Sequence, residues 1–194
     1  GNAMVAWLQV EAGHFAVYAS RYVSGSGWDT PSLIGGAAAE SSNLQLAVDS
    51  EGNALVAWEQ DSGSHLDIHA RRFAAGSGWE TEALISGAIQ DCSAPRLSIS
   101  ATGDGAAIWQ QFDGSRWGVR GGRCSAGTGW SASEQIDDGS TDATSPSVAL
   151  APSGEIESQL EIVLIAFVRR RIYEIAEESA KREHDDRPKH EYGV

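Results

Sequence analysis

The chain has 194 residues, and its 27 acidic side chains outweigh 14 basic ones to give a formal net charge of −13. This balance argues against a nucleic-acid partner, because phosphate backbones are bound by clustered lysine and arginine. Two cysteines are too few for a disulfide scaffold or a thiolate zinc site. The longest apolar run, 162–168, is far shorter than the roughly 20 residues of a membrane-spanning helix, so we expect no membrane span.

One motif recurs at a fixed step of 51 residues: residues 1–7 read GNAMVAW, residues 52–58 read GNALVAW and residues 103–109 read GDGAAIW. Further markers keep the same step: Gly27-Trp28, Gly78-Trp79 and Gly129-Trp130; Gln9, Gln60 and Gln111; Arg21, Arg72 and Arg123. Such self-similarity indicates one supersecondary unit stacked against copies of itself. The organisation expected is three repeats and a tail: 1–51, 52–102 and 103–153, then 154–194.

Within the second repeat the pattern is that of short strands. Residues 54–58 are apolar, and residues 66–73 partly alternate apolar with polar after a hairpin-like polar stretch. A glycine-rich turn precedes Trp79 and a short strand ending at Ile85, and residues 96–100 alternate cleanly. The repeat therefore contains four short strands and no helical period.

Four up-and-down strands in a repeat of this length predict an all-β fold, a partial β-propeller of three four-stranded blades. A blade needs neighbours to cover its faces, and the repeated tryptophans suit the space between blades, each burying on the order of 200 Å². We expect this structural role for Trp7, Trp58, Trp109, Trp28, Trp79 and Trp130. A β-trefoil, which also has three repeats of four strands, is the alternative, although its repeats are usually shorter.

The tail has a different composition, since both lysines and half of the basic residues lie in 155–194. Apolar residues spaced by four predict an α-helix that continues to about Glu183 and stops before Pro188: Ile156, Leu160, Leu164, Val168, Ile172 and Ala176. Such a helix would cap an exposed blade or pair with a second chain, giving a homodimer through residues 155–194. The alternatives are a decayed strand of a fourth blade at 164–168, or unrelated sequence.

The pattern of residues 52–60 (GNALVAWEQ), followed by Ile68 to Phe73, Gly76 to Trp79 and Ala83 to Ile85, resembles a tandem repeat of bacterial secreted and cell-surface proteins. Those repeats are similar to blades of sialidase-like or WD40-like β-propellers. The resemblance covers 1–153 and implies an extracellular or cell-surface location. It also implies six or more copies in a complete ring, so we expect this chain to be part of a longer protein, half of a dimeric ring, or an open arc capped by its tail.

Positions that vary between otherwise similar blades are the best candidates for ligand contacts. Residues Tyr18, His69 and Arg120 share one repeat position, and Glu59 and Gln110 replace Leu8 beside the repeated tryptophan. The repeated Arg21, Arg72 and Arg123 invite comparison with the arginine cluster by which sialidases hold a carboxylate. We favour a structural role for these arginines, because residues at equivalent positions of stacked blades usually have the same role. Examples are a hydrogen bond to a loop carbonyl or a position over the face of an aromatic ring.

No catalytic residue, metal ligand or cofactor is predicted. The acidic stretch 137–142 is a weak calcium candidate and better interpreted as a solvated loop, as is the turn 49–53. No histidine pair has convincing ligand spacing, and no triad or phosphate-loop motif is present. Cys92 and Cys124 remain open between a disulfide and two free thiols.

The function predicted is therefore a non-catalytic extracellular binding or scaffold module that recognises protein or glycan. This interpretation draws on analogy, since fold does not determine function. The alternative is a fragment of a sialidase-like glycosidase whose catalytic residues lie in blades outside this sequence. A third possibility is a self-assembling half-ring.

Overall fold

The computed structural model describes residues 2–87 and 90–151, and all of the regular structure in these residues is β. They lie within one compact unit that spans residues 1–155. The α-helix expected at 154–194 falls outside the described residues. Within the described part of the chain, no helix is long and apolar enough to cross a membrane.

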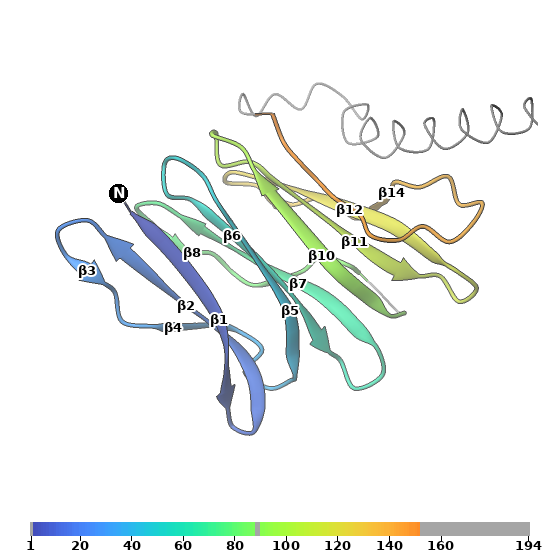
Figure 1. Ribbon diagram of the computed structural model, residues 1–194, viewed down its shortest axis with the longest axis horizontal. Coiled ribbons are helices and arrows are strands. Elements are labelled where there is room, and N and C mark those ends of the chain that lie inside the picture. The colour runs from blue at the N-terminus through green and yellow to red at the C-terminus, as the bar shows by residue number, and fades with distance from the viewer. Residues whose placement is uncertain (1, 88–89, 152–194) are drawn as a thin grey trace, which may run out of the picture. The chain divides into compact units, whose positions relative to one another are not determined.

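Three antiparallel sheets follow one another along the chain (Figure 1). Sheet A contains β1 (Ala3–Glu11), β2 (His14–Val23), β3 (Gly27–Trp28) and β4 (Ser32–Gly35). Sheet B contains β5 (Ser41–Val48), β6 (Ala54–Asp61), β7 (Leu66–Ala74), β8 (Gly78–Trp79) and β9 (Ala83–Leu84). Sheet C contains β10 (Cys92–Ile99), β11 (Gly105–Phe112), β12 (Trp117–Ser125), β13 (Gly129–Trp130) and β14 (Glu134–Gln135). The fourth strand position is broken in two, because β3 and β4 both pair with β2, and the later sheets repeat this arrangement.

The sheets do not coincide with the sequence repeats. The last strand of the first repeat, β5, pairs with β6 at the start of the second repeat, and β10 likewise pairs with β11. Each repeat therefore contributes three strand positions to one sheet and the first strand of the next. Among the described residues sheet A contains no such first strand, so it is four-stranded where sheets B and C are five-stranded.

The core lies between the sheets. One cluster joins sheets A and B through Val17, Ala19, Ile34, Val56 and Trp58. The equivalent cluster joins sheets B and C through Ala57, Ile68, Ala70, Ile85, Cys92, Ala107 and Trp109. In both clusters the repeated tryptophan reaches back toward the preceding sheet, and Trp58 and Trp109 are fully buried. The faces pack in chain order, as an arc of propeller blades does; a trefoil barrel is not formed, because each described strand pairs only within its own sheet.

The repeated G(N/D)(A/G) motif has a local role in this arrangement. The side-chain oxygen of Asn2 accepts a hydrogen bond from the N–H of Ser24 at 3.1 Å, so it ties the start of β1 to the glycine-rich turn after β2. Asn53 and Asp104 make the same bond in the next two sheets, to Ala75 and Ala126. A side-chain acceptor satisfies a turn N–H that no strand partner reaches, which explains why an amide or carboxylate recurs at this position.

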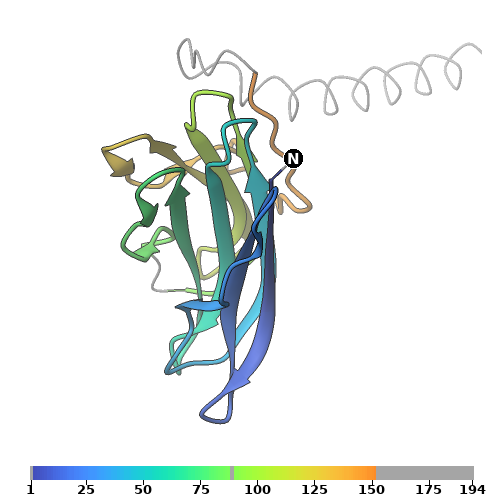
Figure 2. The same ribbon diagram turned by 90° about the vertical axis from the view of Figure 1, so that its left-hand side faces the viewer.

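Figure 2 views the molecule from the side of sheet A, with the long β1 and β2 strands toward the viewer. The inner strands β5 and β10 contact each other, as do β1 and β5. The short strands β3, β8 and β13 lie at the other edge of their sheets.

Candidate functional site

The structure places Tyr18, His69 and Arg120 on three different sheets, each directly across from a repeated tryptophan. The Tyr18 ring stacks on Trp7 with centroids 6.1 Å apart, and the His69 ring stacks on Trp58 at 5.9 Å. The three residues are therefore not gathered into one pocket. His69 and Arg120 lie on the face of their sheet that is directed toward the preceding sheet, whereas Tyr18 lies on the outer face of sheet A.

Their polar groups are bound locally, apart from the buried Nε of Arg120, which has no hydrogen-bond partner in the described part of the chain. The Tyr18 hydroxyl donates to Glu11 at 2.6 Å, and this hydrogen bond is the chief reason that the Tyr18 pKa is raised. His69 Nδ1 lies 2.7 Å from Glu82 Oε1, and Arg120 donates to the carbonyl of Ser133 at 3.2 Å. Each of these contacts lies within a single sheet and its connecting loops.

Glu59 is a buried carboxylate that links two sheets, and only 3% of its surface is exposed. Its Oε1 accepts the N–H of Ala94 in β10 at 2.8 Å, and its Oε2 accepts the Ser42 hydroxyl in β5 at 3.0 Å. Because both oxygens are engaged, a bound ligand is not needed to explain this buried charge. The equivalent Gln110 of sheet C is half-buried.

Two of the repeated arginines, Arg21 and Arg72, contact residues beyond their own sheet. The Arg21 guanidinium lies over the Phe73 ring, 5.7 Å from its centroid. Arg72 is 6% exposed; it donates to Glu80 at 2.5 Å and approaches the Gly103 carbonyl at 3.4 Å. Each guanidinium thus has its own partners at a different sheet junction, and the two do not share one anion.

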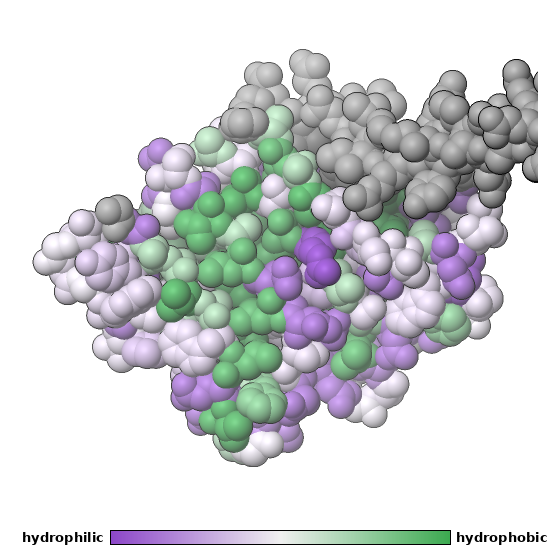
Figure 3. Space-filling model, viewed as in Figure 1, coloured by the Kyte–Doolittle hydropathy of each residue, from purple (hydrophilic) through white to green (hydrophobic). Residues whose placement is uncertain are grey.

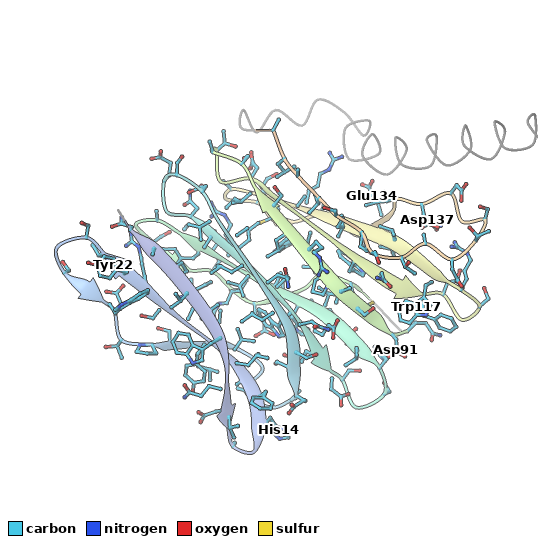
Figure 4. The ribbon with its side chains drawn as sticks, viewed as in Figure 1. His14, Tyr22, Asp91, Trp117, Glu134 and Asp137 are labelled. Carbon is cyan, nitrogen blue, oxygen red and sulfur yellow. The ribbon has the colours of Figure 1, made fainter. Side chains whose placement is uncertain are left out.

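The acidic loop 137–142 closes on itself and on β12. Asp137 accepts hydrogen bonds from Arg116 and from the N–H of Val119, both at 3.0 Å, and Asp142 accepts the N–H of Trp117 at 2.8 Å. Figure 4 shows Asp137 and Trp117 on sheet C, with His14 at the distant tip of the β1–β2 hairpin. Among the described residues, no group of three or more His, Cys, Asp or Glu side chains is placed to hold a metal ion.

One hollow, of about 100 Å³, is bordered by Asn2, Met4, Arg21 and Asp49 at one end of sheets A and B. A second, of about 40 Å³, is bordered by Arg116, Arg120 and Asp137 at sheet C. Both are smaller than the roughly 300–1,000 Å³ usual for pockets that hold organic ligands.

Its most distinctive surface is the outer face of sheet A. Val5 and Trp28 are 39% and 55% exposed, and Trp7 is half-buried. Their counterparts lie between sheets, where Val56, Ala107, Trp58 and Trp109 are completely buried and Trp79 and Trp130 pack against the two core clusters. The outer face of sheet A therefore has the composition of an inter-sheet contact but lacks a covering sheet among the described residues.

The same sheet has an open strand edge. Within the described residues β1 pairs only with β2, whereas β6 and β11 each have a strand on both sides. Figure 3 shows hydrophobic residues gathered over the region of β1, β5 and β6, and again at the hairpin tip, where Val10 and Phe15 are exposed. An unpaired edge beside an apolar face is a template for adding another strand.

The sequence interpretation selected residues by their variation between repeats and missed this surface. The motif of the first repeat does not differ from that of the second in any way that predicts exposure.

The two cysteines are free and buried. Burial raises the pKa of Cys92 to about 12 and that of Cys124 to about 11. Both thiols are therefore protonated and unreactive at neutral pH, which resolves the question left open by the sequence in favour of two free thiols.

Comparison with known proteins gives little beyond this geometry. No family model matches the chain, and no curated protein matches it. Among solved structures, the chain is similar to the Hadza microbial sialidase Hz136, with 14% identity and a TM-score of 0.42 over 63% of this chain. The match spans 34% of that sialidase, about a third of its length. The assignment of an all-β, propeller-like arc of three sheets therefore rests on the strand pairing described above.

Proposed function

We propose that this chain is a non-catalytic binding or scaffold module that recognises protein, and that it does so through the outer face and open edge of sheet A. The observation that carries the proposal is the exposure of Val5, Trp7 and Trp28 at positions that are buried between sheets elsewhere in the molecule. A monomeric surface that keeps the composition of an interior contact marks an interaction site.

Protein is favoured over glycan by the nature of this surface. A glycan needs polar groups beside an aromatic platform to bond its hydroxyls, whereas the polar groups nearest Trp7 are already used: its indole N–H donates to Gln9 at 3.1 Å, and Tyr18 donates to Glu11. What remains is apolar area and the main-chain groups of β1. Main-chain pairing with an open edge is how sheets capture extended peptides.

A glycosidase role is the competing proposal. It would require two carboxyl groups flanking a bound sugar. Three of the described carboxylates, Glu59, Asp137 and Asp142, already accept structural hydrogen bonds. The extracellular or cell-surface location implied by the family resemblance is part of the proposal, as is a bacterial source.

The first test is a selection of displayed peptides on the immobilised chain, paired with a glycan array and with sialoside and aryl-glycoside substrates. We expect enrichment of extended peptides with alternating apolar residues, no glycan binding and no hydrolysis. Val5→Lys should abolish peptide capture, because it places a charge on the outer face, while Leu84→Lys on β9 should not.

Leu84 is a matched control, since its side chain is also exposed, at 51%. Turnover of a glycoside would overturn the non-catalytic role. Binding to glycans alone, unchanged by Val5→Lys, would overturn both the protein partner and the surface.

A further inference from the structure

We infer that sheet C binds a carboxylate group at Arg120, in the small hollow near the end of the sheet where a hairpin joins β11 to β12. The inference goes beyond the proposed function and uses no residue of sheet A as a ligand contact. It rests on a comparison of the repeat position that Tyr18, His69 and Arg120 share. The first two of these side chains have a carboxylate partner within their own repeat. Among the described residues Arg120 has none, although its guanidinium is always charged.

The third repeat has lost both of the glutamates that serve this position. Glu11 binds the side chain of the first repeat at 2.6 Å, and Glu82 binds that of the second at 2.7 Å. In the third repeat Asp113 replaces Glu11, and Ser133 replaces Glu82. Ser133 offers Arg120 only its main-chain carbonyl, which accepts a hydrogen bond from Nη2 at 3.2 Å.

The carboxylates nearest to the hollow are already paired with a different arginine. Asp113 accepts the N–H and the hydroxyl of Ser115, both at 2.8 Å, and the N–H of Arg116 at 3.0 Å. These hydrogen bonds, chiefly that from the Ser115 hydroxyl, lower the pKa of Asp113. The Arg116 guanidinium lies 3.4 Å from Asp113 and 3.0 Å from Asp137. Arg116 therefore compensates both negative charges, and the charge of Arg120 is left without a partner of its own.

The Arg120 guanidinium is also incompletely hydrogen-bonded. Its Nε is buried and has no partner among the described residues. A buried donor of a charged group that lacks an acceptor is unfavourable. A carboxylate is the acceptor best suited to a guanidinium, because its two oxygens can face two parallel N–H groups.

The hollow beside Arg120 has the size of one carboxylate group. Its volume is about 40 Å³, and Gln111, Gly118 and Gln135 contribute to its wall. At roughly 10–15 Å³ for each water-sized group, it holds about three non-hydrogen atoms, as many as a carboxylate contains. Gly118 leaves this space free of a side chain, whereas the second repeat has the buried Asp67 at the equivalent position.

Two glutamine amides supply further donors at the hollow. The carbonyl oxygen of Gln111 accepts the indole N–H of Trp109 at 3.2 Å, which leaves the NH₂ of this amide as a donor. Gln135 in β14 lies directly across from Arg120 and is exposed. A carboxylate has about four acceptor sites, so it can accept N–H groups from the guanidinium and from both amides. A phosphate or sulfate ion has five non-hydrogen atoms and exceeds the volume of the hollow.

Titration with sodium acetate, followed by ¹H–¹⁵N NMR spectra of the full chain, tests the site. We expect saturable shifts of the Arg120 Nε–H and of the side-chain amides of Gln111 and Gln135, and no such shifts with sodium chloride at the same ionic strength. Arg120→Gln should weaken acetate binding by about tenfold or more, the size of one charge-assisted hydrogen bond. Arg96→Gln is the control and should bind acetate as the wild-type chain does. Arg96 also lies on sheet C and donates to a carbonyl, that of Pro95, but it is exposed.

Returning a glutamate to the third repeat gives a second test, which a merely structural role of Arg120 would not pass. Ser133→Glu restores the residue type of Glu82, so we expect its carboxylate to pair with Arg120 and to prevent acetate from binding. Ser133→Gln has the same length without the charge and should still bind acetate. In low salt without acetate, the thermal midpoint of Ser133→Glu should be the higher of the two.

Two probes identify the source of the carboxylate. Acetate represents a free small carboxylate, and a capped pentapeptide with a central glutamate represents an acidic side chain of a protein, with the glutamine peptide as its control. Tighter binding of the glutamate peptide than of acetate would assign the site to a protein partner, and the reverse order would assign it to a small carboxylate. Equal shifts with acetate and chloride, or equal acetate binding by Ser133→Glu and Ser133→Gln, would overturn the inference. Acetate binding that is unchanged in Arg120→Gln would overturn it as well.

Discussion

Sheets A and B contain nearly the same residues in the same register, yet they differ in what covers them. Trp7 and Trp58 each donate their indole N–H to a glutamine two residues later, at 3.1 and 3.2 Å, and each stacks on a ring from the next strand. Trp58 is completely buried by sheet A, while Trp7 stays half-buried. The residues of one repeat thus determine its local structure, whereas the burial of a side chain depends on the sheet packed against it. The contribution of that side chain to stability or to binding depends on the same sheet.

The largest difference in stability between the two sheets is expected when the two tryptophans are truncated. Trp58→Ala should lower the free energy of unfolding by about 3–5 kcal/mol, because it empties a fully enclosed site between sheets. Trp7→Ala should cost about 1 kcal/mol or less in the single chain. Urea unfolding of both variants measures the difference. Equal losses would show that Trp7 is covered in solution.

The next junction, between sheets B and C, can be tested at Glu59. Glu59→Leu restores the residue type that sheet A has at this position, Leu8, but leaves the Ala94 N–H and Ser42 hydroxyl without their acceptor. We expect a loss of about 1–3 kcal/mol, with a smaller loss for Glu59→Gln, which keeps one oxygen acceptor. Thermal unfolding checks the ranking, and the reverse order would contradict the role of this side chain as an acceptor between sheets.

A methyl group tests how closely sheet A approaches Trp58. A Cβ on Gly35 would lie 2.1 Å from the Trp58 ring, so Gly35→Ala must displace the ring and should cost about 1–3 kcal/mol. Gly122→Ala is the matched control, because a Cβ there meets its nearest atom at an ordinary 3.8 Å. Denaturant midpoints of the two variants measure the contrast, and similar midpoints would mean that the sheets are less tightly packed.

The smallest effect at neutral pH is expected from the thiols. Since burial raises the pKa of Cys92 to about 12 and of Cys124 to about 11, the native state holds both protons more tightly than the unfolded chain does. Stability is unaffected below about pH 8 and falls as pH rises from about 9 toward 11, by about 1.4 kcal/mol per pH unit for each thiol.

A thiol reagent at pH 8 should accordingly label the native chain only as fast as it unfolds. Rapid labelling of either cysteine without denaturant would show that it is exposed. The alkaline loss of stability should be smaller in Cys92→Ala than in the wild-type chain.

The strands of this protein were largely predictable from residues 52–102, because alternation, glycine turns and β-branched residues report the local backbone directly. The fold class followed from the 51-residue step between Gly1, Gly52 and Gly103. The candidate binding residues Tyr18, His69 and Arg120 were chosen because they vary between repeats. In the structure each lies beside a repeated tryptophan: His69 and Arg120 between two sheets, and Tyr18 on the outer face of sheet A.

By itself the sequence determined the repeat, its strands and the residues that suit inter-sheet packing, since these depend on side-chain chemistry and short-range periodicity. Only the tertiary structure decided that β5 and β10 belong to the sheet after their own repeat, because strand pairing is a long-range choice that a repeat boundary does not encode. It also decided that, among the described residues, the sheet face of Trp7 lacks a covering sheet, whereas the equivalent faces of Trp58 and Trp109 are covered. The exposed fraction of a side chain depends on the sheet that packs against it. The repeat sequence alone therefore does not distinguish an exposed tryptophan from a buried one.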